Sequence, residues 1–282
     1  MSGFSKKLLF SLKKIIITSR ESDPEKLLKQ LYAAESRAYP RIITNPMTRN
    51  ALVYIFHKFK PESISVTKSI FIQRIDNSIN HLSNSFANIA AIGSKKIKKG
   101  MSVFVHGYSD SVMAVLLKAK KDGIDFEVHC TEEKPYCEGR PLATNLAKHK
   151  IPVKFYADLA LRQALKRADI VMIGAKVIGG VGQVYGRIGS ELIADVAERY
   201  EIPVYVCADT WKINKHVADE FDKSTKLMKE DELWSNPPKG IKILNYGFEK
   251  IHPWLITGII TEKGIYKIPN LLFELKKQNH WL

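Results

Sequence analysis

The sequence predicts an α/β protein with two parts: an N-terminal helical domain over residues 1–96, and a mainly parallel sheet with helices on both faces over residues 97–282. Three observations support this prediction. Apolar residues in the first part recur at three- and four-residue spacing, as on one face of a helix. Gly3 and Gly93 are the only glycines in that part. After Gly100, short β-branched and aromatic runs alternate with amphipathic stretches of about ten to fifteen residues, the rhythm of β-α-β units.

The helical spacing of the first part is clearest in two runs, Leu27-Leu28-Leu31-Tyr32 and Ile75-Ile79-Leu82. Proline has no backbone N–H and restricts the residue before it. We therefore expect the helices to break near Pro40, Pro46 and Pro61.

The first residues of the chain allow two interpretations. Lys6 and Lys7 precede the mostly apolar residues 8–12, as in a signal peptide. However, Lys13 and Lys14 interrupt the apolar run, and no small-residue cleavage site follows. We therefore expect an amphipathic first helix.

Charge and cysteine content narrow the possible environments. The net charge is +15, and residues 1–100 carry 12 of these charges. The first part is therefore expected to face an acidic partner or ligand, or else to be a solvated basic surface.

The cysteine content predicts the cellular compartment. The chain has three cysteines, Cys130, Cys137 and Cys207, and so small and odd a number does not fit a disulfide framework. We therefore expect a cytoplasmic protein. The cysteines lack metal-ligand spacing, and no apolar run approaches the ~20 residues that span a membrane. We expect no metal, no cofactor and no membrane partner.

Six short runs are expected to form the strands: residues 103–105, 126–128, 153–156, 170–173, 204–206 and 241–244. In parallel sheets of this kind, ligands bind beyond the carboxyl ends of the strands, near helix N-termini. Candidate functional residues should therefore lie in the loops that follow these runs.

The loop after the first run has the sequence His-Gly-Tyr-Ser-Asp at residues 106–110 and opens a helix expected over 111–120. Gly107 lets the backbone turn sharply, and Ser109 or Asp110 can cap the helix. Exposed N–H groups and the helix dipole would suit a phosphate, although an ordinary capped turn would have the same sequence.

The loops after the second and fifth runs contribute cations. Lys134 and Arg140 bracket a turn after residues 126–130, where they could clamp an anion or lie on a charged surface. After residues 204–207, Lys212 could bind phosphate, whereas its neighbour Trp211 could equally belong to the core.

Residues 174–190, after the fourth run, hold six glycines among seventeen residues and lead into a helix. Such a flexible composition directly after a buried strand favours a ligand loop over a purely packed segment.

In this order and spacing, the loops resemble those of one protein superfamily. The shared pattern is His-x-x-Ser, then Thr-Glu-x-x-Pro-x-x-x-Gly-Arg, then Gly-Ala-x(11)-[Lys/Arg]-Ile-Gly-[Ser/Thr], then Thr-Trp-Lys, and finally a closing segment at residues 245–264. The superfamily contains the alpha, beta and delta subunits of translation initiation factor 2B, methylthioribose-1-phosphate isomerase and archaeal ribose-1,5-bisphosphate isomerase. The match runs from about Ile75 to Gly264, and residues 1–74 are compatible with the family's helical N-terminal domain.

The resemblance implies a Rossmann-like second domain and a sugar-phosphate pocket between the domains. In the isomerases, a cysteine in the first loop and an aspartate after Gly-Ala carry the chemistry. Here these positions hold Gly107 and Lys176, so both catalytic positions are expected to be vacant. Glycine has no side chain to move a proton, and an ammonium is a poor substitute for a carboxylate.

The resemblance also implies a ligand-binding set that this chain keeps in part. The family's Asn-Lys pair reads Gly186-Arg187 here, and Asp110 replaces a lysine and would repel phosphate. The candidate ligand- and phosphate-binding residues are Tyr108, Ser109, Lys134, Glu138, Arg140, Arg187, Ser190 and Lys212.

The sequence thus predicts a non-catalytic, initiation factor 2B-like regulatory subunit that binds a sugar phosphate or nucleoside monophosphate. The resemblance implies initiation factor 2 as a candidate partner and a homodimer formed through the C-terminal domain. Direct RNA binding is not favoured, because no RNA-recognition module is recognisable.

The alternative prediction is a ribose-1,5-bisphosphate isomerase with displaced catalytic groups. Cys130 or Cys137 would then supply the thiol, and Glu132, Glu133 or Asp209 the carboxylate.

Overall fold

The structure, a computed structural model, describes residues 3–42, 45–214 and 228–278. The chain forms two compact units. One comprises residues 1–85 and 276–282, and the other comprises residues 86–275. None of the helices among the described residues combines the length and the apolar character needed to cross a bilayer.

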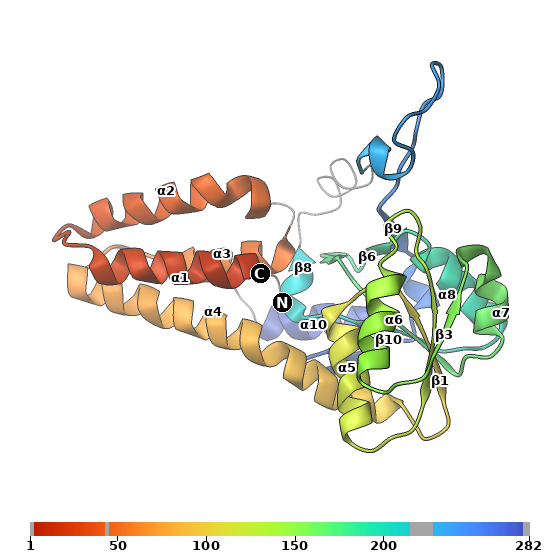
Figure 1. Ribbon diagram of the computed structural model, residues 1–282. Helices are drawn as coiled ribbons and strands as arrows, with labels where there is room; N and C mark the ends of the chain where they lie inside the picture. The colour runs from red at the N-terminus through yellow and green to blue at the C-terminus, as the bar shows by residue number, and fades with distance from the viewer. Residues whose placement is uncertain (1–2, 43–44, 215–227, 279–282) are drawn as a thin grey trace. The chain divides into compact units, whose positions relative to one another are not determined.

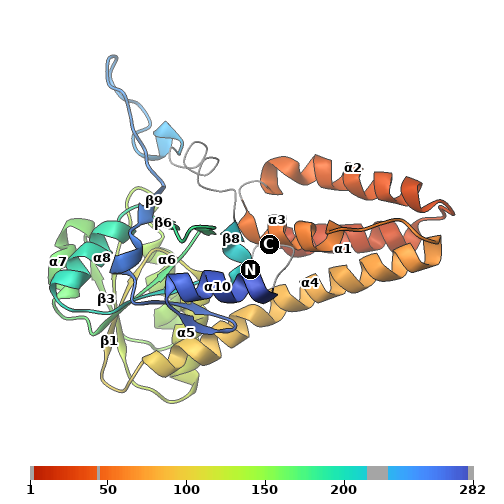
Figure 2. The same ribbon diagram turned by 180° about the vertical axis from the view of Figure 1, so that it is seen from behind.

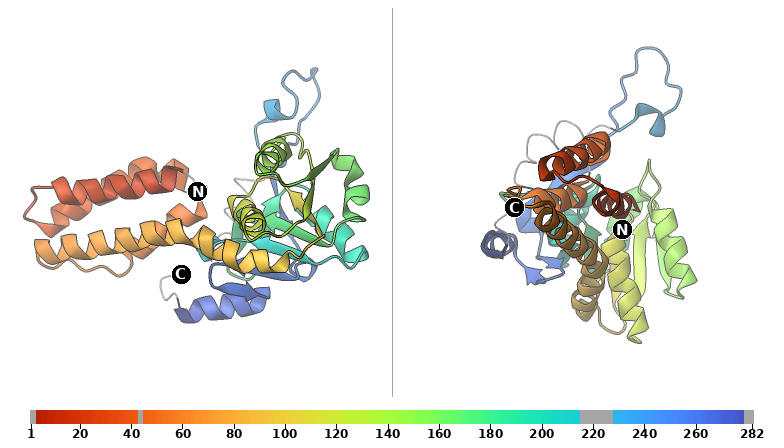
Figure 3. Two further views of the ribbon diagram at one scale, coloured as in Figure 1. Left: turned by 60° about the horizontal axis from the view of Figure 1, so that its bottom comes forward. Right: turned by 90° about the vertical axis from the view of Figure 1, so that its left-hand side faces the viewer.

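The first unit is helical and contains α1 (Gly3–Thr18), α2 (Pro24–Ile42), α3 (Pro46–Phe56) and most of α4 (Ile64–Gly93), which lie side by side (Figures 1 and 3). Lys13 on α1 and Asp76 on α4 form an ion pair at 2.6 Å. The core is built from apolar side chains at helical spacing, among them Leu9, Leu12, Ile16, Leu27, Leu31, Ile75 and Leu82.

The prolines of this unit act in different ways. Pro46 is the first residue of α3, and the side chain of Asn45 accepts a hydrogen bond from the Thr48 amide at 3.2 Å. Pro61 precedes α4, as expected. The prediction of a break near Pro40 is wrong, because α2 continues to Ile42. Pro40 lies in the last turn, where the loss of one backbone hydrogen bond does not stop the helix immediately.

The second unit is built on a seven-stranded sheet in the order β11-β10-β7-β4-β1-β2-β3. The pairing is parallel except between β10 and β11, which confirms the predicted mainly parallel sheet. The strands are β1 (Ser102–His106), β2 (Glu127–Thr131), β3 (Val153–Tyr156), β4 (Ile170–Gly174), β7 (Val204–Cys207), β10 (Gly258–Thr261) and β11 (Gly264–Tyr266).

Helices cover both faces of this sheet, as Figures 1 and 2 show. The end of α4, α5 (Asp110–Lys121) and α6 (Gly139–Lys148) pack on one face. Opposite them lie α7 (Leu161–Leu165), α8 (Ser190–Arg199) and α10 (Ile268–Gln278). In β1, Phe104 belongs to the core on the α8 side, whereas Val103 and Val105 belong to the core on the α5 side. Short 3₁₀ turns occupy Ser94–Lys96, Asp158–Ala160, Thr210–Lys212, Glu230–Glu232 and Pro253–Leu255.

The glycine-rich segment 174–190 is largely ordered as strands rather than as an open loop. A second sheet has the order β8-β5-β6-β9, formed by β8 (Ile213–Asn214), β5 (Val177–Gly179), β6 (Val184–Arg187) and β9 (Phe248–Ile251). β5 and β6 form an antiparallel hairpin, with Gly182 at φ +96° in its turn. The glycines therefore serve a tight hairpin in addition to any role in ligand binding.

The predicted strand at residues 241–244 is wrong. These residues have no strand structure, and Ile241 and Leu244 are about half exposed. The strand in this part of the chain is β9, which pairs with β6 through Phe248–Arg187 and Glu249–Gly186. Apolar alternation favours a strand only where a partner edge is available, and residues 241–244 have none.

Candidate functional site

The strand order of the main sheet reverses between β1 and β4, because the chain builds β2 and β3 on one side of β1 and β4 and β7 on the other. Loops diverge at such a switch point and open a crevice at the carboxyl ends of the strands. The loops after β1, β2, β4 and β7 all end there. They carry Gly107, Glu133, Lys176 and Lys212, respectively.

Gly107 and Glu133 face each other at the start of this crevice. Gly107 has φ +64°, a left-handed conformation, and a Cβ placed on it would lie 3.2 Å from Glu133 Oε2. The Glu133 side chain is 1% exposed, and neither of its oxygens has a hydrogen-bond partner among the described residues. Burial raises the pKa of Glu133 to about 7, although the nearby Arg187 acts in the opposite direction. The space beside Gly107 thus contains a carboxyl group from the second loop.

Arg187, at the end of β6, is held by acidic and aromatic side chains. Its guanidinium donates two hydrogen bonds to Glu138, and its Nε lies 3.5 Å from Glu133 Oε1. The guanidinium also lies over the rings of Tyr136 and Phe248, with 5.1 and 4.9 Å to the ring centres. Arg187 is therefore in place, but two carboxylates already surround its charge.

Lys176 is a cation for which the described part of the chain supplies no acidic partner. It is half-buried, burial lowers its pKa, and among the described residues no carboxylate pairs with it. Its ammonium lies 5.6 Å from the centre of the Phe248 ring. Lys212 is its neighbour, and the positive charge of Lys176 acts to lower the pKa of Lys212. An anion entering here would offset the penalty that burial imposes on the Lys176 ammonium.

Unlike Lys176, Lys212 has a hydrogen-bond partner and nearby negative charges. Its Nζ donates to the Ala175 carbonyl at 2.7 Å. Burial lowers the pKa of Lys212, whereas the negative charges of Asp209 and Asp110 act to raise it. Lys212 thus fixes the loop that carries Lys176 and adds positive charge beside it.

Ser109 caps α5 at the same place. Its Oγ accepts a hydrogen bond from the Val112 amide at 3.4 Å, and a Cβ on Gly174 would lie 2.6 Å from that oxygen. The first loop therefore packs directly on the end of β4, two residues before Lys176. Tyr108 donates its amide to Glu138 at 3.4 Å and accepts from Asn145 through its hydroxyl at 3.1 Å.

The N-terminus of α8 already donates a hydrogen bond to a carboxylate of this chain. Gly189 precedes it with φ +94°, Ser190 is buried against Gly186, and the Glu191 amide donates to Glu249 Oε1 at 2.7 Å. Burial raises the pKa of Glu249. An acidic side chain of this chain therefore takes the position that a phosphate would need at α8.

Lys134 and Arg140 bracket an acidic side chain of the second loop. Arg140 donates two hydrogen bonds to Glu132, and Lys134 Nζ lies 3.8 Å from the same carboxylate. Both cations are exposed. In this structure, the two cations proposed as an anion clamp hold Glu132.

Of the groups considered for displaced catalysis, Glu133 alone is placed beside Gly107. Cys130 is buried in the core on the α5 side, and burial raises its pKa to about 12. The Cys137 thiol contacts the Pro135 carbonyl at 3.6 Å. Asp209 accepts from the Trp211 amide at 2.7 Å and so caps a 3₁₀ turn.

A cavity of about 180 Å³ adjoins Glu133 at the carboxyl ends of β1, β2 and β3. Its polar lining includes His106, Glu133 and Asp158, and its apolar lining includes Leu161 and Ile193. Asp158 accepts hydrogen bonds from the amides of Glu133 and Lys134, both at 2.8 Å. Asp158 thereby holds the second loop in place, with Glu133 in the left-handed region at φ +62°.

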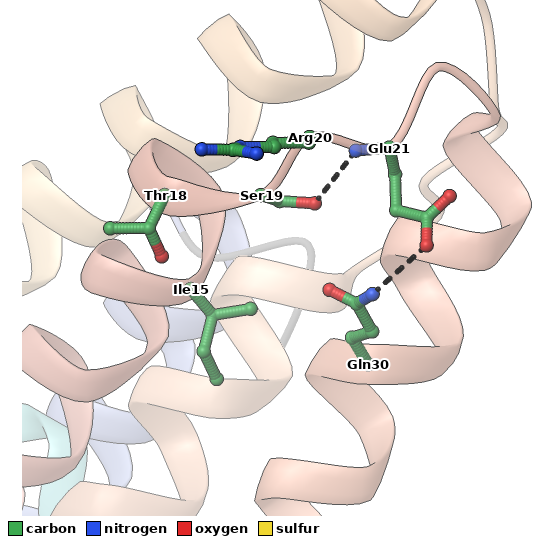
Figure 4. Close-up of a pocket in the computed structure, with 6 residues that line it drawn as sticks. All are labelled: Ile15, Thr18, Ser19, Arg20, Glu21 and Gln30. Carbon is green, nitrogen blue, oxygen red and sulfur yellow. Dashed lines mark hydrogen bonds between the residues drawn. The ribbon is translucent and has the colours of Figure 1, made fainter.

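A second hollow, of about 420 Å³, lies in the helical unit and is lined by Ile15, Thr18, Ser19, Arg20, Glu21 and Gln30 (Figure 4). Its polar groups bind one another: the Glu21 amide donates to Ser19 Oγ, and Gln30 Nε2 donates to Glu21 Oε1, both at 3.3 Å. It holds no buried charge, which makes the crevice of the second unit the better candidate site.

Some residues of the site were not identified from the sequence. Asp158 follows β3 just as the other candidates follow their strands, so the strand-end rule could have found it. The ring of Phe248 contacts the side-chain cations of Lys176 and Arg187, and His106 lines the cavity. No sequence pattern predicts either of these roles.

The chain is similar in sequence to a known protein family and to proteins with two different names. Residues 5–268 match the model of a family described as the initiation factor 2 subunit family. The ribose 1,5-bisphosphate isomerase of Pyrococcus furiosus is 30% identical over 279 residues, covering 93% of this chain and 84% of that protein. A protein of the same organism named putative translation initiation factor eIF-2B subunit 2-like is 32% identical over 222 residues, covering 78% of this chain and 76% of its own.

The fold is shared with a solved structure. The crystal structure of the translation initiation factor eIF-2B of Pyrococcus horikoshii OT3 matches with a TM-score of 0.77 at 23% identity, covering 95% of this chain and 92% of that chain. The relatives carry both of the names that the motifs suggested, an isomerase and a translation factor subunit.

Proposed function

The chain belongs to the initiation factor 2 subunit family, and we propose that it is a non-catalytic member that binds a sugar phosphate or nucleoside monophosphate. The phosphate would lie beside Lys176, with Lys212 and the N-terminus of α5 at Ser109 next to it.

The observation that carries this proposal is the half-buried ammonium of Lys176, which no carboxylate neutralises among the described residues. A phosphate would restore a favourable environment for that charge. Ser109 and the first amides of α5 add hydrogen-bond donors and the positive end of a helix dipole.

The absence of turnover follows from Gly107 and Lys176. Gly107 offers no group that moves a proton, and Lys176 carries a positive charge where the resemblance calls for a carboxylate. General acid and base groups each contribute about 10²–10⁴-fold to a rate. Binding without isomerisation is therefore the expected behaviour.

The test is ligand binding by Lys176→Gln, measured by calorimetry and by ligand-induced thermal stabilisation. Loss of one charge-assisted contact costs about 1.5–3 kcal/mol, so affinity for a sugar phosphate should fall roughly tenfold or more. Lys154→Gln is the matched control. Lys154 pairs with Glu127 at 2.7 Å, at the opposite ends of the strands, and its variant should bind as the wild type does. Equal affinities for wild type and Lys176→Gln would place the phosphate elsewhere.

An isomerase activity is the second candidate, and Glu133 is the observation that favours it. A buried carboxyl with a pKa of about 7 is suited to take and return a proton near neutral pH. It lies beside Gly107, in reach of the position where the isomerases carry their thiol.

A turnover assay separates the two candidates. Isomerase-free preparations of the wild type are expected to form no product from ribose 1,5-bisphosphate or methylthioribose 1-phosphate. Turnover at about 1 s⁻¹ or more, abolished in Glu133→Gln, would establish the isomerase instead. Activity gained only in the double variant Gly107→Cys, Lys176→Asp would identify these positions as the vacated catalytic site.

The proposal also includes two protein partners, a second copy of the chain and initiation factor 2. A homodimer formed through residues 97–282 and an association with initiation factor 2 are supported by membership of the family. Light scattering on the purified chain tests the dimer, which is expected to have twice the 32.0 kDa of the monomer.

A further inference from the structure

The amino ends of the parallel strands lie at the edge of the main sheet opposite the crevice. At this edge, four neighbouring strands in the order β4-β1-β2-β3 are each entered from a preceding helix or 3₁₀ turn. The four entering segments are residues 94–101, 118–126, 147–152 and 166–169. Because these strands are parallel, the four segments lie side by side along one edge. We call the surface that they form the amino-edge surface.

The amino-edge surface is strongly basic. Its four segments carry eleven Lys and Arg residues and three Asp residues. Residues 86–275 as a whole carry 28 Lys and Arg residues against 23 Asp and Glu residues. The excess of cations at this edge is therefore larger than that of the whole unit, and acidic residues are in excess elsewhere in the unit. A polyanion would be attracted to this edge.

Most of these cations are not neutralised by carboxylates of this chain. The three Asp residues are engaged locally, in ion pairs with Lys118 and Lys120 and in a hydrogen bond with the Ser102 amide. For eight exposed cations, the described residues supply no ion pair: Lys95, Lys98, Lys99, Lys121, Lys148, Lys150, Lys166 and Arg167. Each of the four segments contributes at least one of them.

Helix dipoles account for only part of this set of cations. A cation in the last turn of a helix is stabilised by the helix dipole, and Lys121 and Lys148 have this position in α5 and α6. In contrast, Lys98, Lys150 and Arg167 lie beyond the helix ends, in the connections to the strands. Their charges are not offset by contacts within the described part of the chain.

The composition of the amino-edge surface distinguishes between kinds of polyanion. None of the exposed large apolar side chains of the described residues lies in its four segments. Protein interfaces are built around aromatic and apolar anchors and are depleted in lysine. A membrane-binding surface also inserts apolar side chains into the lipid. A lysine-rich surface without such anchors fits the phosphodiester backbone of a nucleic acid, which binds through charge.

The dimensions of the amino-edge surface also fit a nucleic-acid backbone. Neighbouring strands of a sheet lie about 4.8 Å apart, so four strands spread the cations over about 15 Å. One strand of a duplex carries a phosphate every ~3.4 Å along the axis, so about four phosphates can face this edge. The eight cations without ion pairs are enough to neutralise them.

We propose that the amino-edge surface binds the backbone of a nucleic acid, through contacts between its lysine and arginine side chains and the phosphates, without reading the bases. The proposal is independent of the phosphate site proposed at Lys176, which lies at the opposite ends of the strands. An RNA-recognition module, which is not recognisable in the sequence, is needed to read bases and not to contact phosphates.

Fluorescence anisotropy of a labelled single-stranded RNA of mixed sequence, titrated with the full chain, tests this surface. The edge variant Lys98→Gln, Lys99→Gln, Lys148→Gln, Lys150→Gln removes four exposed cations from two segments. Between about 50 and 200 mM salt, the wild type should lose affinity with a logarithmic slope of about 0.7 per phosphate contacted. The edge variant should bind at least roughly tenfold more weakly, with a slope that is smaller by about 3.

The matched control removes the same number of charges elsewhere in the unit. The variant Lys229→Gln, Lys239→Gln, Lys242→Gln, Lys250→Gln changes four exposed lysines outside the four segments. It should bind RNA as the wild type does. Equal weakening by both variants would show attraction to the net charge of the chain rather than to this surface, and would overturn the proposal. Failure of the wild type to bind RNA at low salt would also overturn it.

Two further probes separate phosphate contacts from other kinds of binding. Single-stranded DNA of the same sequence should bind as RNA does, because both carry the same backbone charge. A tenfold preference for either one would contradict a surface that contacts phosphates alone. Polyglutamate of the same length should bind more weakly than RNA. If it bound as tightly, and the edge variant weakened it equally, the surface would belong to an acidic protein partner and the proposal would be wrong.

Discussion

Replacement of the buried carboxyl of Glu133 by an amide should make the protein more stable at alkaline pH. The pKa of Glu133 rises from 4.5 to about 7 on folding, mainly because the side chain is buried. At about 1.4 kcal/mol per pKa unit, an ionised Glu133 therefore destabilises the folded state by about 3 kcal/mol. Glu133→Gln removes this charge while it keeps the size of the side chain.

The sign of the pH dependence follows from the raised pKa. The folded protein binds the proton of Glu133 more tightly than the unfolded chain does. This contribution to stability is therefore complete below pH 4.5 and is lost as the pH rises to about 7. We expect wild type and Glu133→Gln to have similar free energies of unfolding near pH 4.5. Above pH 7, the variant should be more stable by up to about 3 kcal/mol.

Urea denaturation at pH 5 and pH 8, followed by circular dichroism, measures this difference. Glu132→Gln is the matched control, because it makes the same chemical change one residue away in a carboxylate that pairs with Arg140. That variant should gain no stability at pH 8. The reasoning fails if Glu133→Gln is no more stable than the wild type at pH 8, since the buried carboxyl would then ionise without cost.

Two further predictions concern packing and thiol chemistry. A Cβ on Gly139 would lie 1.9 Å from the Thr131 carbonyl oxygen. Gly139→Ala should therefore lower the free energy of unfolding by about 3 kcal/mol. A urea midpoint equal to that of the wild type would contradict the predicted steric clash. Burial raises the pKa of Cys130 and Cys207 to about 12, so an aromatic disulfide reagent at pH 8 should label Cys137 alone in the folded protein, and Cys137→Ser should abolish the reaction.

The sequence predicted the architecture of the main sheet better than that of its additions. The parallel strands β1, β2, β3, β4 and β7 were recognisable as short apolar runs, of which β1 and β4 pack on both faces. The parallel strand β10 was not predicted. The hairpin β5–β6 could not be predicted from the sequence, because this segment is rich in glycine and its strands are stabilised by pairing with β8 and β9. Residues 241–244 were misassigned because strand formation depends on a partner edge that lies elsewhere in the sequence.

The candidate site was predictable as a place but not as a set of charges. Strand-end loops pointed to Ser109 and Lys212, and both lie at the crevice. The sequence could not show that Glu132 pairs with Arg140, nor that no carboxylate in the described part of the chain pairs with Lys176, because ion pairs are set by side-chain positions in three dimensions. Glu133 was one of three acidic candidates, and its burial against Gly107 distinguished it.

The small sheet β8-β5-β6-β9 also determines when the crevice can form during synthesis of the chain. Lys176 directly precedes β5 and Arg187 is the last residue of β6, so both lie at the open end of its central hairpin. Phe248, whose ring both cations contact, belongs to β9, the last of its strands in the sequence. A nascent chain that ends before residue 248 already contains β1, β2, β3, β4 and β7, yet it lacks this platform. Contacts between such distant segments are made late and slowly. Ligand binding should therefore appear only after nearly all of the chain has left the ribosome.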